Sequence, residues 1–155
     1  ARNIYVMGLR SAAPIAQFLA YYLNFIFDNV RVVSEASGDV FEQISRINES
    51  DLLFGISFPR YSKRTISAMK FARDRGARCL GLTDGKVSPL NEISDVCLYT
   101  KSEMVSFLDS LVAPLSMINA LIMAVSARDR TRTFKTFREL ENVWKEYEVY
   151  GTVES

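Results

Sequence analysis

The segment LLFGISFPRYSKRT, Leu52 to Thr65, changes character halfway along its length. Its first part, Leu52 to Ile56, is a continuous apolar run of the length expected for a strand buried on both faces. The residues after it combine small hydroxyls with the cations Arg60, Lys63 and Arg64, just before a helical pattern begins. This combination is compatible with a solvated loop, an anion-binding site or a catalytic loop.

The same alternation of short apolar runs and longer helical patterns extends along the whole chain. Besides the run that starts at Leu52, four others have strand character: Ile4–Gly8, Val30–Ser34, Arg78–Thr83 and Val96–Thr100. Strands separated by helices predict βαβ units, in which a parallel sheet is covered on both faces. We therefore expect an α/β fold, a three-layer doubly wound sandwich whose parallel sheet has about five strands flanked by helices.

Several helices are indicated by apolar residues spaced three and four positions apart. Pro14 stands where a first helical turn is expected, and Tyr21 and Phe25 add a second apolar side to that helix. The region from Phe107 to Arg128 predicts a long apolar helix, which Pro114 either bends or begins. A helix that is apolar on two sides usually has two partners, so we expect a homodimer or higher homo-oligomer.

Composition narrows the class of protein. With 155 residues, 48% hydrophobic and 24% charged, the chain fits one globular domain spanning residues 1–155. The net charge of +1 gives no global argument for nucleic-acid binding, so any preference for anions must be local. There is no histidine, and Cys79 and Cys97 lie in apolar runs, so we expect no metal site and no cofactor. The most apolar stretch falls short of the ~20 residues of a membrane span, and we expect a cytoplasmic protein without membrane contact.

Three loops leave the carboxyl ends of the predicted strands, which is where open α/β sheets bind ligands. In the first, Gly8 allows a ligand to approach the backbone, and Arg10 stands at the rim. Ser11 offers a hydroxyl near a helix N-terminus, where free amides and the helix dipole favour an anion. The alternative for Ser11 is an ordinary helix N-cap. The third loop, Thr83 to Asp95, is rich in turn formers.

The loop after Leu52–Ile56 has similar properties. Ser57 and Ser62 are hydroxyl donors ahead of another helix, and Arg60 carries a planar guanidinium suited to phosphate or carboxylate. The alternative is that Arg60 and its cationic neighbours form a solvated face. Two hydroxyl-bearing loops at adjacent positions favour an anion pocket more than either loop does alone.

Three segments resemble the successive motifs of the sugar isomerase (SIS) domain, in particular that of the RpiR/MurR family of bacterial transcription regulators. They are GLRSAAPIA, LLFGISFPRYSKRTISA and GARCLGLTDGKVSPLNEISDVCLYT. The SIS pattern has a first strand ending Gly-x-Gly/Arg-x-Ser, a later strand ending Ser-x-Ser-Gly-x-Thr, and a Thr-Asp…Ser-Pro-Leu…Asp segment. The last of these is matched by Thr83, Asp84, Ser88, Pro89, Leu90 and Asp95.

This resemblance implies a five-stranded parallel sheet, frequent dimerisation and a phosphosugar site at the strand ends. Pro59 replaces the middle serine of the motif, which removes a hydroxyl and a backbone N–H, and Arg60 replaces the glycine. Arg60 could supply the lost donors, or the pocket could be re-aimed at a different anion or partly filled. The ligand-binding residues expected from the loops and the resemblance together are Gly8, Arg10, Ser11, Ser57, Arg60, Tyr61 and Ser62.

SIS domains also serve as phosphosugar isomerases, which need a general base and often a histidine. Glu103 and Asp109 are the only acids worth considering here, and neither has an evident partner, so we expect no catalytic residue and no enzyme. The resemblance to RpiR-type regulators instead implies a sensor of a phosphorylated sugar or related anionic metabolite. Such regulators carry an N-terminal helix-turn-helix domain, expected to lie outside this chain, and only that domain would contact DNA.

A basic segment from Arg128 to Arg138 interleaves cations with Phe134 and Phe137, a pattern that can indicate a nucleic-acid surface. Asp129 and Glu139 interrupt it, and the phenylalanines fit the packing of a final helix. We therefore interpret the segment as a solvated helix face.

Overall fold

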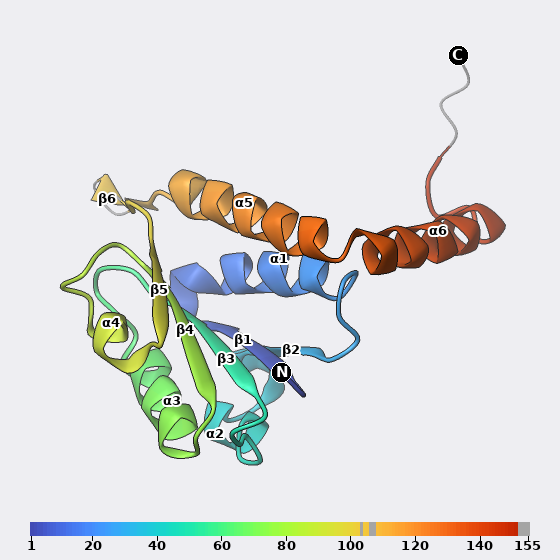
Figure 1. Ribbon diagram of the computed structural model, residues 1–155. Helices are drawn as coiled ribbons and strands as arrows, with labels where there is room; N and C mark the ends of the chain where they lie inside the picture. The colour runs from blue at the N-terminus through green and yellow to red at the C-terminus, as the bar shows by residue number, and fades with distance from the viewer. Residues whose placement is uncertain (103, 106–107, 152–155) are drawn as a thin grey trace.

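A five-stranded parallel sheet forms the centre of the molecule, with strand order β2-β1-β3-β4-β5 (Figure 1). This computed structural model describes residues 1–102, 104–105 and 108–151. The strands are β1 (Ile4–Gly8), β2 (Val30–Val33), β3 (Leu52–Ile56), β4 (Arg78–Thr83) and β5 (Val96–Tyr99). The expected doubly wound α/β fold is confirmed.

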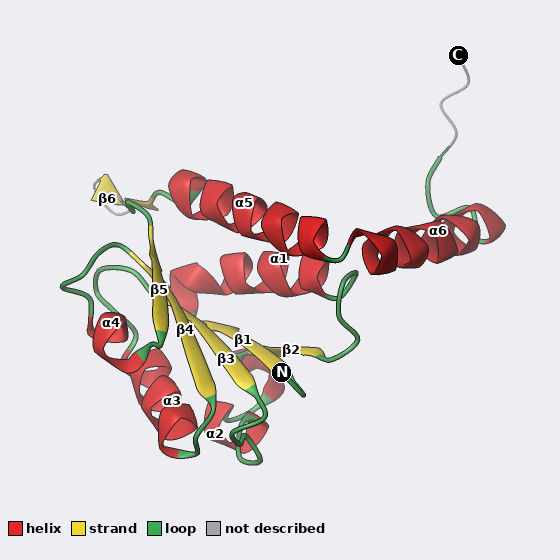
Figure 2. Ribbon diagram, viewed as in Figure 1, coloured by secondary structure: helices red, strands yellow, loops and turns green. Residues whose placement is uncertain are grey.

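Helices cover both faces of the sheet and complete a three-layer sandwich (Figure 2). One face carries α1 (Ala13–Leu23) and α5 (Val112–Arg128), and α6 (Arg130–Glu146) continues beyond them. The opposite face carries α2 (Val40–Gln43), α3 (Lys63–Asp74) and α4 (Pro89–Ile93). Two 3-10 turns, η1 (Arg10–Ala12) and η2 (Glu35–Ser37), follow β1 and β2.

The sheet divides the core into two clusters of buried side chains. Along β1, Tyr5 and Met7 pack with α2, α3 and α4, whereas Ile4 and Val6 pack with α1 and α5. Successive side chains of a strand point to opposite faces, so a strand covered on both sides must be apolar at every position. This is why the central strands read as uninterrupted apolar runs in the sequence.

The strand order places β1 beside β3, although the helices that follow them lie on opposite faces of the sheet. Gly8 at the end of β1 pairs with Ile56 at the end of β3, so the two loops leave the sheet at the same level. A crevice is expected outside the carboxyl ends of strands at such a switch point.

Two details differ from the sequence-based expectation. The predicted helix from Phe107 to Arg128 begins at Val112, and a two-stranded hairpin of β6 (Met104–Val105) and β7 (Leu108–Asp109) precedes it. Pro114 therefore lies in the first turn of α5, where its missing N–H costs nothing, while Phe107 lies outside the described residues. The loop from Thr83 to Asp95 contains α4, which the Ser88 side chain caps.

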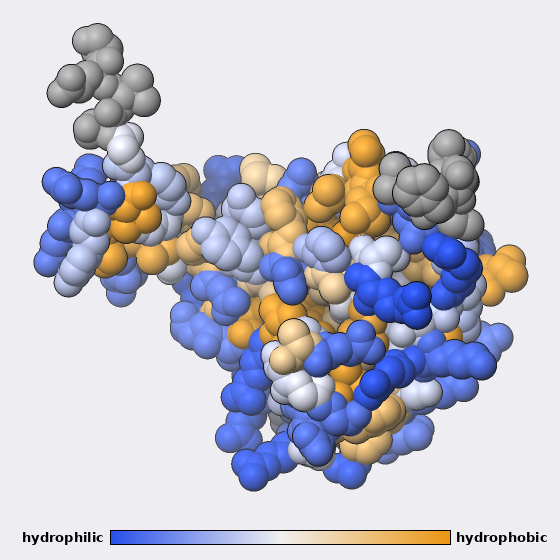
Figure 3. Space-filling view, turned by 180° about the vertical axis from the view of Figure 1, so that it is seen from behind, coloured by the Kyte–Doolittle hydropathy of each residue, from blue (hydrophilic) through white to orange (hydrophobic). Residues whose placement is uncertain are grey.

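α6 projects from the body of the molecule (Figure 1). Phe137 packs on Phe25 of the segment after α1, with ring centroids 5.3 Å apart. Met123 on α5 and Phe134 on α6 are 68% and 70% exposed. Figure 3, which views the molecule from behind, shows apolar surface among the polar residues on that face. Among the described residues, the helices are too short or too polar to cross a membrane.

Apart from Arg128 at the end of α5, the cations of the basic segment lie on α6, and two of them are paired with acids. Arg132 forms an ion pair with Asp28 at 2.7 Å, and Lys135 lies 4.0 Å from Glu139. These contacts agree with a solvated helix face.

Candidate functional site

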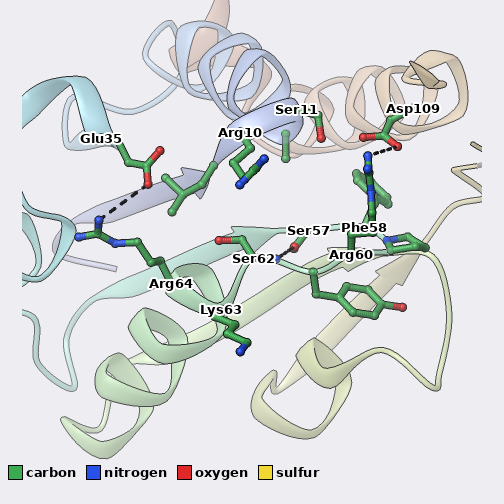
Figure 4. A pocket seen from close by; sticks show the side chains of 14 residues that line it. Arg10, Ser11, Glu35, Ser57, Phe58, Arg60, Ser62, Lys63, Arg64 and Asp109 are labelled. Atoms are coloured by element: carbon green, nitrogen blue, oxygen red, sulfur yellow. Dashed lines mark hydrogen bonds and ion pairs between the residues drawn. The ribbon is translucent and has the colours of Figure 1, made fainter. Parts of the chain in front are cut away.

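A pocket of about 460 Å³ opens at the carboxyl ends of β1 and β3, between η1 and the start of α3 (Figure 4). Its volume is in the range of small-metabolite sites. It lies at the switch point of the sheet, which is where the sequence predicted a ligand. Of the predicted site residues, six line it: Arg10, Ser11, Ser57, Arg60, Tyr61 and Ser62.

Ser57 and Ser62 form the floor of this pocket. Ser57 is 4% exposed, and its Oγ accepts a hydrogen bond from the Ser62 backbone N–H at 3.1 Å. The Ser62 Oγ accepts from the Thr65 backbone N–H at 3.2 Å and thereby caps α3. Both hydroxyls act as acceptors, so their own hydrogens are left to donate. The first-turn amides of α3 add free donors and the positive end of a helix dipole.

The loop after β1 contributes Ser11 but not Gly8. The N-caps of η1 and α1 are Leu9 and Ala12, so the alternative in which Ser11 caps the helix is wrong. The Ser11 side chain is exposed at the pocket and caps nothing. Gly8 does not line the pocket; a Cβ there would lie 2.6 Å from the Ala12 carbonyl oxygen. Gly8 lets η1 and α1 pack closely on β1, which the sequence did not distinguish from ligand approach.

Arg60 occupies a backbone conformation that favours glycine. Its φ is 67°, in the left-handed region, so it keeps the local shape available to the glycine of the SIS motif while adding a cation. Its Nη2 lies 3.6 Å from Asp109 Oδ1, and the Arg60 side chain is 66% exposed. An ion pair this long and this accessible to water contributes little, so an anionic ligand can compete with Asp109 for the guanidinium.

Tyr61 ties the loop after β3 to the loop after β4. Its hydroxyl donates to Asp84 Oδ1 at 2.8 Å, and the Thr83 Oγ1 lies 3.1 Å from the same oxygen and 2.7 Å from the Ser88 Oγ. Burial, followed by the hydrogen bond to Asp84, raises the pKa of Tyr61. The tyrosine therefore stays protonated at neutral pH and holds the segment Ser57–Ser62, the anion loop, against β4.

Among the described residues, four further charged side chains line the pocket that were not assigned to it from the sequence: Glu35, Lys63, Arg64 and Asp109. Arg64 pairs with Asp39 at 2.5 Å and with Glu35 at 3.9 Å, so its guanidinium faces η2 and α2. Asp109 reaches the pocket through the hairpin before α5, an approach that no local pattern indicates. Glu103, the other acid considered as a catalyst, lies outside the described residues. No group of His, Cys, Asp or Glu among the described residues could hold a metal ion.

The fold and the pocket place the chain in the doubly wound α/β class, with its candidate site at the switch point. Within that class the chain belongs to the SIS domain family, because the SIS domain model matches residues 1–124. The family expected from the motifs is confirmed.

Relatives of the chain include regulators and enzymes. An uncharacterised HTH-type transcriptional regulator of Caldanaerobacter subterraneus is 27% identical over 117 residues, which cover 71% of this chain and 42% of that protein. The phosphoheptose isomerase of Aliarcobacter butzleri is 40% identical over 55 residues, which cover 36% of this chain and 29% of that protein. The chain thus spans less than half of either relative.

Two solved structures share the fold. The sugar isomerase domain of an RpiR transcription factor from Sphaerobacter thermophilus is 29% identical, with a TM-score of 0.85, covering 92% of this chain and 79% of that chain. The Vibrio vulnificus NanR protein complexed with ManNAc-6P is 21% identical, with a TM-score of 0.81, covering 95% of this chain and 56% of that chain. These agreements extend through both helical layers.

Proposed function

We propose that this chain is the effector-sensing and dimerisation domain of an RpiR-type transcription regulator, and that its effector is a phosphosugar or related anionic metabolite. The observation that carries the proposal is the switch-point pocket, where two serine hydroxyls and a helix N-terminus face a cationic rim. The RpiR sugar isomerase domain and the helix-turn-helix regulator among the relatives support the regulatory role. The NanR complex supports the class of ligand.

In this proposal the phosphate lies on the pocket floor. Ser57 and Ser62 donate their hydroxyl hydrogens to it, and Ser11 donates from the loop after β1. The free amides at the start of α3 add hydrogen bonds and a favourable dipole. Arg60 replaces the donors lost at Pro59 by turning from Asp109 towards the phosphate, where a charge-assisted bond is stronger than the long ion pair.

A thermal-shift screen tests the proposal. Phosphosugars are compared with inorganic phosphate, sulfate and the unphosphorylated sugars, because a ligand at 100 times its Kd stabilises the folded state by about 2.7 kcal/mol. We expect a selective shift with a phosphosugar that is lost in Ser57→Ala and Arg60→Ala, each compared with its own ligand-free melting temperature. Arg78→Ala is the matched control, because Arg78 is exposed at the start of β4, at the amino-terminal ends of the strands and away from the pocket. Phosphosugars that shift the protein no more than inorganic phosphate would refute the proposal.

Isomerase activity is the alternative. Among the described residues, two carboxylates line the pocket: Glu35 lies 3.9 Å from Arg64, and Asp109 is released when Arg60 turns to the phosphate. Asp109 would then be a lone candidate base, and the chain has no histidine to assist it in opening a sugar ring. We therefore infer that the domain binds its ligand without converting it. Proton NMR of the bound phosphosugar checks this inference: aldose–ketose conversion that depends on the protein would overturn it.

Dimerisation involves a separate surface. A groove of about 350 Å³ lies between α1, α5 and α6, lined by apolar side chains that include Phe25, Ile122 and Phe137. We infer that a second copy of the chain covers this side, so that effector binding changes how two protomers and their DNA-binding domains are arranged. Sedimentation of Met123→Glu, at a 68% exposed position of this groove, should show loss of the dimer, whereas Val87→Glu, at a 98% exposed loop position, should not. A wild-type monomer at micromolar concentration would contradict the inference.

A further inference from the structure

Two arginines of the pocket share an unusual backbone conformation. Arg10, in the loop after β1, has φ 56°, and Arg60, in the anion loop, has φ 67°. Non-glycine residues seldom adopt this region, and such strain gathers at ligand sites, where the surrounding structure holds it in place. Both loops therefore use a strained residue to present a guanidinium to the same cavity.

The two guanidiniums lie on different sides of the pocket floor. In Figure 4, Arg60 stands beside Phe58 and is directed towards Asp109, while Arg10 lies on the side of Glu35 and Arg64. In the same view, Ser62 lies below Arg10, and Ser57 lies below and between the two arginines. A ligand seated on the floor would thus have one cation at each end.

The charges around the pocket leave Arg10 uncompensated. Four cationic and two acidic side chains of the described residues line the cavity. Arg64 is committed to Asp39 and Glu35, Arg60 has Asp109, and Lys63 is directed away from the cavity in Figure 4. Within the described part of the chain, Arg10 forms no ion pair within 4.0 Å, and Glu35, the acid on the same side of the pocket in Figure 4, lies 3.9 Å from Arg64.

We propose that the pocket takes a ligand with two separate anionic groups: a phosphate on the Ser57–Ser62 floor beside Arg60, and a carboxylate or second phosphate at Arg10. The proposal rests on the proposed function and narrows its ligand class to phosphorylated sugar acids and sugar bisphosphates. A guanidinium without a carboxylate partner forms stronger hydrogen bonds with an anion than with a sugar hydroxyl, because the bonds are then charged on both sides. The cavity of about 460 Å³ has room for a ligand of this size.

Isothermal titration calorimetry with matched ligand pairs tests this assignment. Glucose 6-phosphate is compared with 6-phosphogluconate, an open-chain acid in which the C1 aldehyde is oxidised to a carboxylate, and fructose 6-phosphate with fructose 1,6-bisphosphate, which adds a phosphate. We expect the second anion to lower the dissociation constant of the wild type on the order of tenfold in at least one pair. This is the effect of one additional charge-assisted hydrogen bond on affinity. The pair that shows the gain identifies the second group as carboxylate or phosphate.

Substitution of Arg10 then locates the second anion. Arg10→Gln should remove the gain, so that the two members of each pair bind with similar affinity, because the second group loses its partner. Arg10→Lys should keep part of the gain. Arg78→Gln removes the same charge at the amino-terminal end of β4, far from the pocket, and should leave the gain intact. This control distinguishes a contact between Arg10 and the ligand from an effect of the protein's net charge.

The possible failures are distinguishable. Equal affinity for both members of each pair overturns the two-anion proposal but leaves phosphosugar sensing in place. Equal weakening of both members by Arg10→Gln also overturns it, because both arginines would then hold one phosphate. No ligand binding better than inorganic phosphate overturns the proposed function itself, and this proposal with it.

Discussion

Replacing Arg60 by glycine and by alanine separates its backbone strain from its charge. Both variants lose the guanidinium and its 3.6 Å contact with Asp109, so that contribution cancels when the two are compared. The remaining difference is how well each residue tolerates a φ of 67°. Glycine adopts this conformation freely, whereas the Cβ of alanine opposes it.

The expected difference follows from two opposing effects. An L-residue pays about 1–2 kcal/mol in the left-handed region. Arg60→Gly avoids this cost, but it loses about 0.4–1 kcal/mol relative to Arg60→Ala because glycine has more freedom in the unfolded chain. Arg60→Gly should therefore be more stable than Arg60→Ala by about 0.5–1 kcal/mol, which is about 1–4 °C in melting temperature for a chain of this size.

Urea unfolding of the ligand-free variants, followed by circular dichroism, measures this difference. Lys70, an exposed residue within α3, provides the control. Glycine in a helix interior is about 1 kcal/mol less favourable than alanine, so Lys70→Gly should be less stable than Lys70→Ala, the opposite order to the Arg60 variants. Both Arg60 variants should lose phosphosugar affinity equally, since both lack the cation. An Arg60→Ala variant as stable as Arg60→Gly would refute the assignment of strain to this position.

Three further outcomes are expected. Gly8→Ala should lose about 1–3 kcal/mol of unfolding free energy in urea, because its Cβ would lie 2.6 Å from the Ala12 carbonyl oxygen in a packed core. Tyr61→Phe should lose about 1 kcal/mol at pH 8. The raised pKa of folded Tyr61 means that the unfolded tyrosine ionises first, so this deficit relative to the wild type should shrink as the pH rises above 10.0, measured by urea unfolding at each pH. Burial and the nearby Asp95 raise the pKa of Cys79 to about 11, so mass spectrometry after thiol labelling at pH 8 should find Cys79 modified only in denatured protein.

Much of the fold could be predicted from the sequence because the sheet is buried on both faces. Leu52–Ile56 and Ile4–Gly8 must be apolar throughout, and such runs are visible without any tertiary information. Gly76 similarly marks the end of α3, and its φ of 82° is the conformation that a helix-ending glycine supplies. The hairpin before α5 could not be predicted, because strands of two residues carry no periodic signal.

The candidate site was predictable in position but not in geometry. The carboxyl ends of parallel strands share one edge, so Ser11, Ser57 and Ser62 could be placed together from topology alone. The backbone conformations of Arg10 and Arg60 could not, because arginine has no preference for the left-handed region and its neighbours impose it. Asp109 reaches Arg60 through tertiary packing, and nothing near it in sequence indicates that contact.

The changes in the anion loop alter how phosphate is held as well as how strongly. The SIS motif has a serine and a glycine where this chain has Pro59 and Arg60. A hydroxyl or backbone amide at such a position is a fixed donor that need not move when the anion binds. Pro59 removes two of these donors, and Arg60 replaces them with a charge on a long side chain that is 66% exposed. Such a charge is attracted to the ligand over a greater distance, but added salt screens it more strongly than buried donors. Phosphosugar affinity in this domain should therefore fall more steeply with ionic strength in the wild type than in Arg60→Gly. Equal salt dependence in the two proteins would mean that Arg60 stays with Asp109 and that the floor binds the phosphate alone.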